Sequence, residues 1–113
     1  MKSRHIAGLL FTACLAVVTT GALAAEGNAA AGKQKRSMCE GCHGIPMYRT
    51  AFPEVYSVPK LGGQHAAYIV KALQEYKAKQ RSHPSMLAVA ASLSDQDMAD
   101  LAAYYSGEKA SAK

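Results

Sequence analysis

The stretch from Cys39 to Gly44, which reads CEGCHG, determines how the rest of the chain must be arranged. It places two cysteines three residues apart and a histidine directly after the second. Positions i and i+3 of a helical turn face the same way, so the thiols of Cys39 and Cys42 can meet two neighbouring vinyl groups of one porphyrin edge. The spacing is typical of a covalently attached haem of the c type. It predicts thioethers at Cys39 and Cys42, with His43 as the proximal iron ligand.

Two other kinds of site use cysteines at this spacing: a redox-active or structural disulfide, and a zinc site. A thioredoxin-like site needs an apolar strand before Cys39, and the sequence has none there. Zinc needs four ligands, and only the scattered His65 and His83 remain to complete a set. Haem attachment is therefore the favoured interpretation.

Residues 1–24 have the pattern of a secretory signal peptide. A short basic start precedes an uncharged apolar run over residues 6–18, and a small-x-small pattern ends at Ala24. We expect cleavage after Ala24 or, as second choice, after Ala25, and hence a periplasmic location. An uncleaved membrane anchor is the alternative, because the uncharged stretch continues to Ala25.

Residues 25–113 are expected to form one domain. Loss of Lys2 and Arg4 with the signal lowers the formal charge of +5 by two, and haem propionates would lower it further, so nucleic acid is a poor candidate partner. Cys14 lies in the signal and is expected to have no role in the mature protein. A domain of this size buries little apolar surface, and a covalent haem would provide the missing stabilisation.

Three helices are predicted from periodicity and capping residues. The first covers residues 28–38 with Asn28 as N-cap, the second covers 65–79, and the third is capped by Ser94, with Asp97 at N3, and ends at Gly107. Residues 44–58 have neither helical nor strand periodicity and are expected to form a loop. Six residues of this loop should be buried, at a haem edge or in a second small core: Ile45, Met47, Tyr48, Phe52, Val55 and Tyr56.

The sixth iron ligand is predicted to be Met86, which follows Pro84 and is far enough along the chain to reach the other side of a haem. Met38 and Met47 lie too close to His43 to do so, and Met98 belongs to the apolar stripe of the last helix. His83 is the rival ligand. Methionine is favoured because a histidine and methionine pair raises the potential, as an electron carrier needs.

The order of these features resembles the short class I cytochromes c of bacteria, especially the single-haem relatives of the dihaem type. It is carried by CEGCHG, PKLGGQ at 59–64, a helix ending in YKAKQR at 76–81, the single Met86 and LSDQDMADLAAYY at 93–105. The resemblance implies an all-α small cytochrome c fold, with three to five helices wrapped around one covalent haem c. The segment 44–58 departs from it, because the family often has a polar turn there.

The resemblance also assigns roles to single residues. It implies that Pro59 offers its backbone carbonyl to the Nδ1 hydrogen of His43, which would fix the tautomer of the iron ligand. It implies that Leu61 packs on the haem, and that Tyr104 or Tyr105 helps the last helix to cross the first.

These observations predict a periplasmic electron-transfer protein rather than an enzyme, serving redox proteins as donor and acceptor. Lys77, Lys79 and Arg81 are candidate docking residues for an acidic partner. A dedicated haem subunit of a larger dehydrogenase or oxidase is an alternative, and a haem sensor or peroxidase with an open sixth position is another. Contact with a membrane is expected only through a partner complex or an uncleaved signal anchor.

Overall fold

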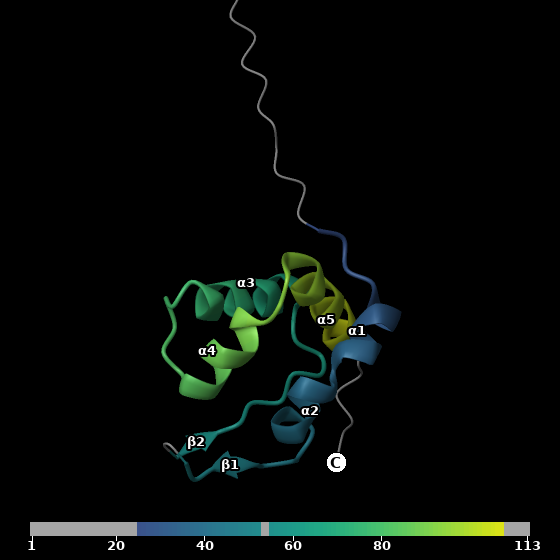
Figure 1. Cartoon of the computed structure of the whole chain (residues 1–113). Helices are drawn as coiled ribbons and strands as arrows, with labels where there is room; N and C mark the ends of the chain where they lie inside the picture. Colours follow the sequence, from purple (N-terminus) through teal and green to yellow (C-terminus); the bar gives the residue numbers. More distant parts are fainter. Residues whose placement is uncertain (1–24, 53–54, 108–113) are drawn as a thin grey trace, which may run out of the picture.

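The computed structural model describes residues 25–52 and 55–107 (Figure 1). These residues form five helices and one antiparallel two-stranded hairpin, so the all-α prediction is confirmed. The elements are α1 (Ala29–Lys35), α2 (Ser37–His43), β1 (Arg49–Thr50), β2 (Tyr56–Ser57), α3 (Ala66–Lys77), α4 (Pro84–Ala91) and α5 (Asp95–Gly107). The predicted signal segment 1–24 and the residues 108–113 lie outside the described chain. No described helix has the length and apolar character needed to cross a membrane.

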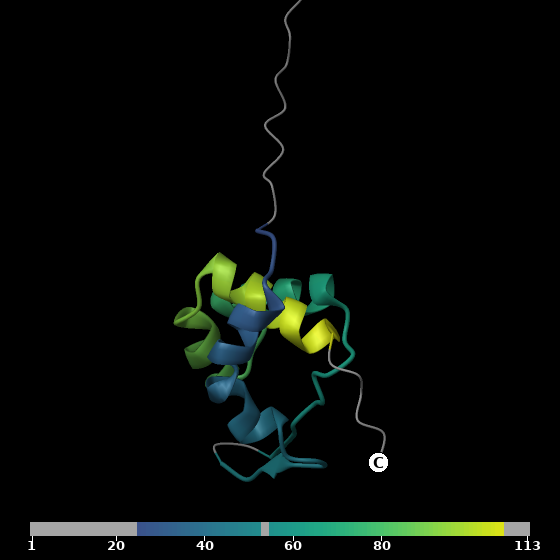
Figure 2. The ribbon, with the colours of Figure 1, turned by 90° about the vertical axis from the view of Figure 1, so that its right-hand side faces the viewer.

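Helices α1 and α5 pack directly against each other (Figures 1 and 2). Two glycines make this approach possible: a Cβ atom on Gly27 would collide with the carbonyl of Ala99, and one on Gly32 would collide with the carbonyl of Asp100. Tyr104 lies at this crossing, against Gly32, as the resemblance implied. Tyr105 points instead into the hydrophobic core.

A buried carboxylate joins the same two helices. Asp100 is 3% exposed and accepts hydrogen bonds from the backbone N of Asn28 at 2.8 Å, from Lys35 Nζ at 2.7 Å and from Gln96 Nε2 at 2.8 Å. Lys35 also pairs with Asp97 at 2.7 Å. The hydrogen bond from Lys35, together with those from Asn28 and Gln96, lowers the pKa of Asp100 to about 2.

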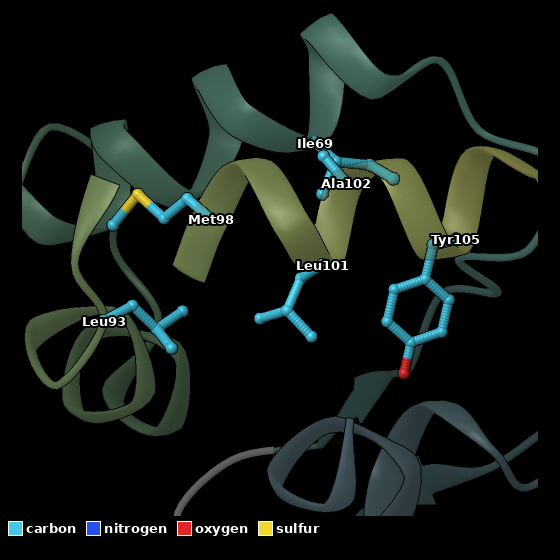
Figure 3. Close-up of a cluster of buried hydrophobic side chains, with 6 residues drawn as sticks. All are labelled: Ile69, Leu93, Met98, Leu101, Ala102 and Tyr105. Atoms are coloured by element: carbon cyan, nitrogen blue, oxygen red, sulfur yellow. The ribbon is translucent and has the colours of Figure 1, made fainter. Parts of the chain in front are cut away.

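The hydrophobic core lies between α3, α5 and the segment that joins α4 to α5 (Figure 3). Its buried members are Ile69, Leu93, Met98, Leu101, Ala102 and Tyr105. Met98 is fully buried, which confirms its interpretation as a core residue. The predicted cap of α5 is also confirmed, because Asp97 Oδ2 accepts from Ser94 N at 2.9 Å and Ser94 Oγ accepts from Asp97 N at 3.1 Å.

The structure differs from the predicted helices in two ways: the extent of the first helix is wrong, and one helix was missed. The first helix is interrupted at Arg36, because the Arg36 guanidinium donates to the carbonyl of Lys33, which Ser37 would use in a continuous helix. Helix α4 was not predicted, although Pro84 at its first position is a common helix start.

The segment 44–58 contains the strands β1 and β2 rather than an irregular loop. Ile45, Met47, Phe52 and Val55 are not buried within the protein chain, because their exposed fractions run from 48% to 97%, so the predicted second small core is wrong for these residues. Tyr48 and Tyr56 are half-buried. The hairpin lies beyond α2, away from α3 and α5, so these four side chains do not reach the core (Figures 1 and 2).

Candidate functional site

A cavity of about 230 Å³ opens between α2, the segment after the hairpin, and helices α3, α4 and α5. Most of its lining is apolar, from residues such as Ile69, Leu73, Val89 and Leu101. All six predicted site residues also line it: Cys39, Cys42, His43, Pro59, Leu61 and Met86. The structure therefore brings together predicted residues that are spread over two helices, α2 and α4, and the segment that precedes α3.

Helix α2 presents both cysteines to this cavity. Cys39 is half-buried and packs against the core cluster, whereas Cys42 is exposed. Both thiols are free of disulfide bonds. Burial raises the pKa of the Cys39 thiol, and a hydrogen bond with Tyr105 opposes this increase. One helical turn thus offers two reduced thiols to one cavity, which is the arrangement that two thioether bonds to one porphyrin require.

The imidazole of His43 is held in place by a backbone group. Its Nδ1 lies 2.6 Å from the carbonyl oxygen of Pro59, the contact that the resemblance implied. A carbonyl oxygen only accepts hydrogen bonds, so Nδ1 carries the proton and Nε2 keeps its lone pair for a metal. Leu61, two residues further on, lines the same cavity and packs against the core.

Met86 lies in the first turn of α4 and lines the cavity. The other methionines within residues 25–107 are placed differently. Met38 lines the cavity but belongs to α2, the helix that bears the cysteines; Met47 is 97% exposed; and Met98 is buried in the core. Met86 is thus the methionine that reaches the cavity from a helix other than α2.

Neither remaining histidine of the described chain lines the cavity. His83 is the N-cap of α4, where its Nδ1 accepts a hydrogen bond from Met86 N. His65 precedes α3 and is exposed. Within the described residues, no three His, Cys, Asp or Glu side chains are grouped as a metal site, so the zinc alternative has no support.

The three proposed docking cations have different surroundings. Arg81 lines the cavity, with its guanidinium 5.0 Å from the centre of the Tyr76 ring and a hydrogen bond to Tyr68 that raises its pKa. Lys77 donates to the backbone carbonyl of Leu93. Lys79 remains exposed. A cation in the wall of an apolar cavity suits an anionic group on a bound molecule. No sequence pattern had indicated that Arg81 lines the cavity.

The chain was also compared with known proteins. Residues 24–106 match the family model described as Cytochrome c. The chain belongs to the cytochrome c family. It is 38% identical to a cytochrome c4 of Pseudomonas aeruginosa over 103 residues, which cover 91% of this chain and 49% of that protein. It is 40% identical to cytochrome c-554(548) of Halomonas halodenitrificans over 86 residues, which cover 74% of this chain and 99% of that protein.

A crystal structure of reduced recombinant cytochrome c4 from Pseudomonas stutzeri has the same fold, with a TM-score of 0.59 and 37% identity over 74% of this chain and 46% of that one. The chain therefore spans about half the length of the cytochromes c4 that it matches. These findings make it a c-type cytochrome, with a covalently attached haem. The paired thiols, the imidazole with a free Nε2, the thioether and the apolar walls fit such a group.

Proposed function

We propose that this chain is a periplasmic one-electron carrier whose haem is attached through Cys39 and Cys42 and ligated by His43 and Met86. The observation that carries the proposal is the convergence of all four side chains on one apolar cavity. The ligand pair combines an imidazole oriented by Pro59 with a thioether from a separate helix.

Each of these residues has a defined task. The Pro59 carbonyl keeps the proton of His43 on Nδ1, which orients Nε2 and strengthens it as a ligand. Met86 supplies a thioether, which favours reduced iron and so raises the potential. When bound, the haem supplies a reversible one-electron change at its iron. His43 and Met86 would together hold the iron, which would leave no place at the metal for a substrate, so the site favours electron transfer over catalysis.

The proposed location rests on the sequence. The segment 1–24 has the pattern of a secretory signal, and the paired cysteines lie in the part of the chain that would remain after cleavage. The partners would be redox proteins that donate and accept single electrons. Contact with a membrane would come only through such a partner or through an uncleaved signal.

Carbon monoxide provides the functional test, because it binds reduced haem iron only where an axial position is open. The holoprotein, produced with the haem-attachment machinery, should titrate as a reversible one-electron couple and should not bind carbon monoxide when reduced. Met86→Ala should keep its covalent haem and bind the gas. Met38→Ala, which removes the other methionine of the cavity wall, should behave as the wild type. Binding by the wild-type protein would contradict the proposal and favour a sensor or peroxidase.

A second candidate function is a dedicated subunit of a larger redox complex. The four large apolar side chains that the hairpin segment exposes favour it, because apolar side chains exposed close together along a chain can form an interface. Purification from the native source separates the two functions: a stoichiometric partner that stays bound through size exclusion indicates a subunit, and a monomeric cytochrome indicates a shuttle.

A further inference from the structure

The first turn of α4 is held by His83. Pro84 at the first position has no N–H, and the backbone N of Leu87 donates to the carbonyl of His83 at 2.9 Å. The backbone N of Met86 donates to His83 Nδ1 at 3.4 Å. His83 thus caps this helix through the backbone N of Met86, the residue whose side chain lines the cavity.

The ring of His83 is itself positioned from the hairpin. The rings of Tyr56 and His83 lie 4.4 Å apart between centroids at an interplanar angle of 47°. Tyr56 belongs to β2, where its backbone N donates to Thr50 Oγ1 at 3.1 Å. The segment 44–58 thus runs from His43 to Pro59, which holds the His43 ring, and it contacts His83 on the way.

Helix α4 has eight residues, too few to be stable alone, and α3 is the one described helix that it packs against closely. A single cap is therefore expected to have a large influence on the position of Met86.

We propose that His83 is the positioning residue for Met86, and that Tyr56 fixes the His83 ring for this purpose. The inference rests on the proposed function, because it takes Met86 as the axial ligand. His83 acts through the backbone of Met86 and does not bind the iron, since its Nδ1 accepts the capping hydrogen bond and its ring is not part of the cavity wall. One hairpin segment then supports both axial ligands, His43 through Pro59 and Met86 through His83.

Imidazole provides the test, because it competes with Met86 for oxidised iron. Its affinity is measured on the oxidised holoprotein from the loss of the weak near-infrared band that arises from sulfur bound to iron. Loss of the cap should raise the apparent affinity roughly fivefold in His83→Ala. His83→Asn replaces the ring by a good capping side chain and should recover most of the wild-type affinity. Tyr56→Ala should also raise the apparent affinity for imidazole. Tyr48→Ala is the matched control, because it removes another tyrosine of the segment 44–58.

The outcomes distinguish the positioning role of His83 from the assignment of Met86 as a ligand. If the wild-type band is present and His83→Ala and Tyr56→Ala both stay within about twofold of wild type, the inference is wrong and the ligand assignment stands. Equal shifts in Tyr48→Ala and Tyr56→Ala would also overturn it, because the effect would then belong to the hairpin as a whole. Failure of His83→Asn to recover the wild-type affinity would exclude the capping hydrogen bond as the cause of the shift, and so overturn the inference. A wild-type protein with haem but without the band would instead remove the proposed ligand pair itself.

Discussion

Two parts of the molecule are stabilised in different ways: the first half is the pair of helices α1 and α5, and the second half is α2 with the hairpin. Helices α1 and α5 pack against each other through glycines, with a buried carboxylate between them. Helix α2 is absent from the closely packed pairs of helices, and the part made of α2 and the hairpin segment exposes five large apolar side chains. The first half is held by contacts within the chain. We infer that the second half depends on the haem that the cavity accommodates.

Removal of the covalent attachment should separate the halves most clearly. Cys39→Ala/Cys42→Ala should yield a protein without covalent haem in which the backbone amides of residues 37–65 lose more protection from hydrogen exchange than those of α1 and α5. The holoprotein under the same conditions is the reference. Equal loss of protection in both halves would show that the core also depends on the haem.

Gly32→Ala should disrupt the other half, because the added methyl group meets the backbone of Asp100, which cannot move aside as a side chain can. We expect a loss of about 3 kcal/mol, or more than about 10 °C in Tm for a domain of this size. Gly41→Ala in α2 is the matched control, because its Cβ would meet nothing within 4 Å. Similar losses in the two variants would contradict the contrast between the halves.

The acid stability of the protein should depend on Asp100. Its pKa is lowered to about 2 by Lys35 and the surrounding donors, against about 4 in an unfolded chain. A depressed carboxyl pKa stabilises the folded state above about pH 4, and this stabilisation is lost as the pH falls towards 2. The difference in Tm between wild type and Asp100→Asn should therefore be large at pH 6 and shrink towards pH 2. A difference that does not change with pH would exclude the carboxylate as its source, and exposed Asp95→Asn serves as control.

Polar substitution of the exposed hairpin should have the smallest effect. Met47 and Phe52 are 97% and 87% exposed, so Met47→Ser and Phe52→Ser should each change the free energy of unfolding of the holoprotein by less than about 0.5 kcal/mol. Urea titration of the haem absorbance measures this. A loss of more than about 1 kcal/mol would restore the sequence-based expectation that these side chains cover a haem edge.

The features of the two halves also differ in how far the sequence could predict them. The CEGCHG stretch, the cap of α5 and the position of Met86 are local or spacing signals: the cap is present, and Cys39, Cys42, His43 and Met86 line one cavity. The break at Arg36 depends on a side chain that competes for one carbonyl, and the place of Arg81 depends on how α3 meets α4. Such features follow from tertiary packing. The exposure of the hairpin was missed because apolar composition predicts burial without saying which surface is available.

The assignment of Met86 as the sixth ligand is tested most directly by the near-infrared spectrum of the oxidised holoprotein, in which sulfur bound to iron gives a weak band. We predict that the wild type and Met38→Ala show the band and that Met86→Ala loses it while keeping its covalent haem. A band that survives in Met86→Ala, or a haem-bearing wild type without it, would contradict the ligand pair of His43 and Met86.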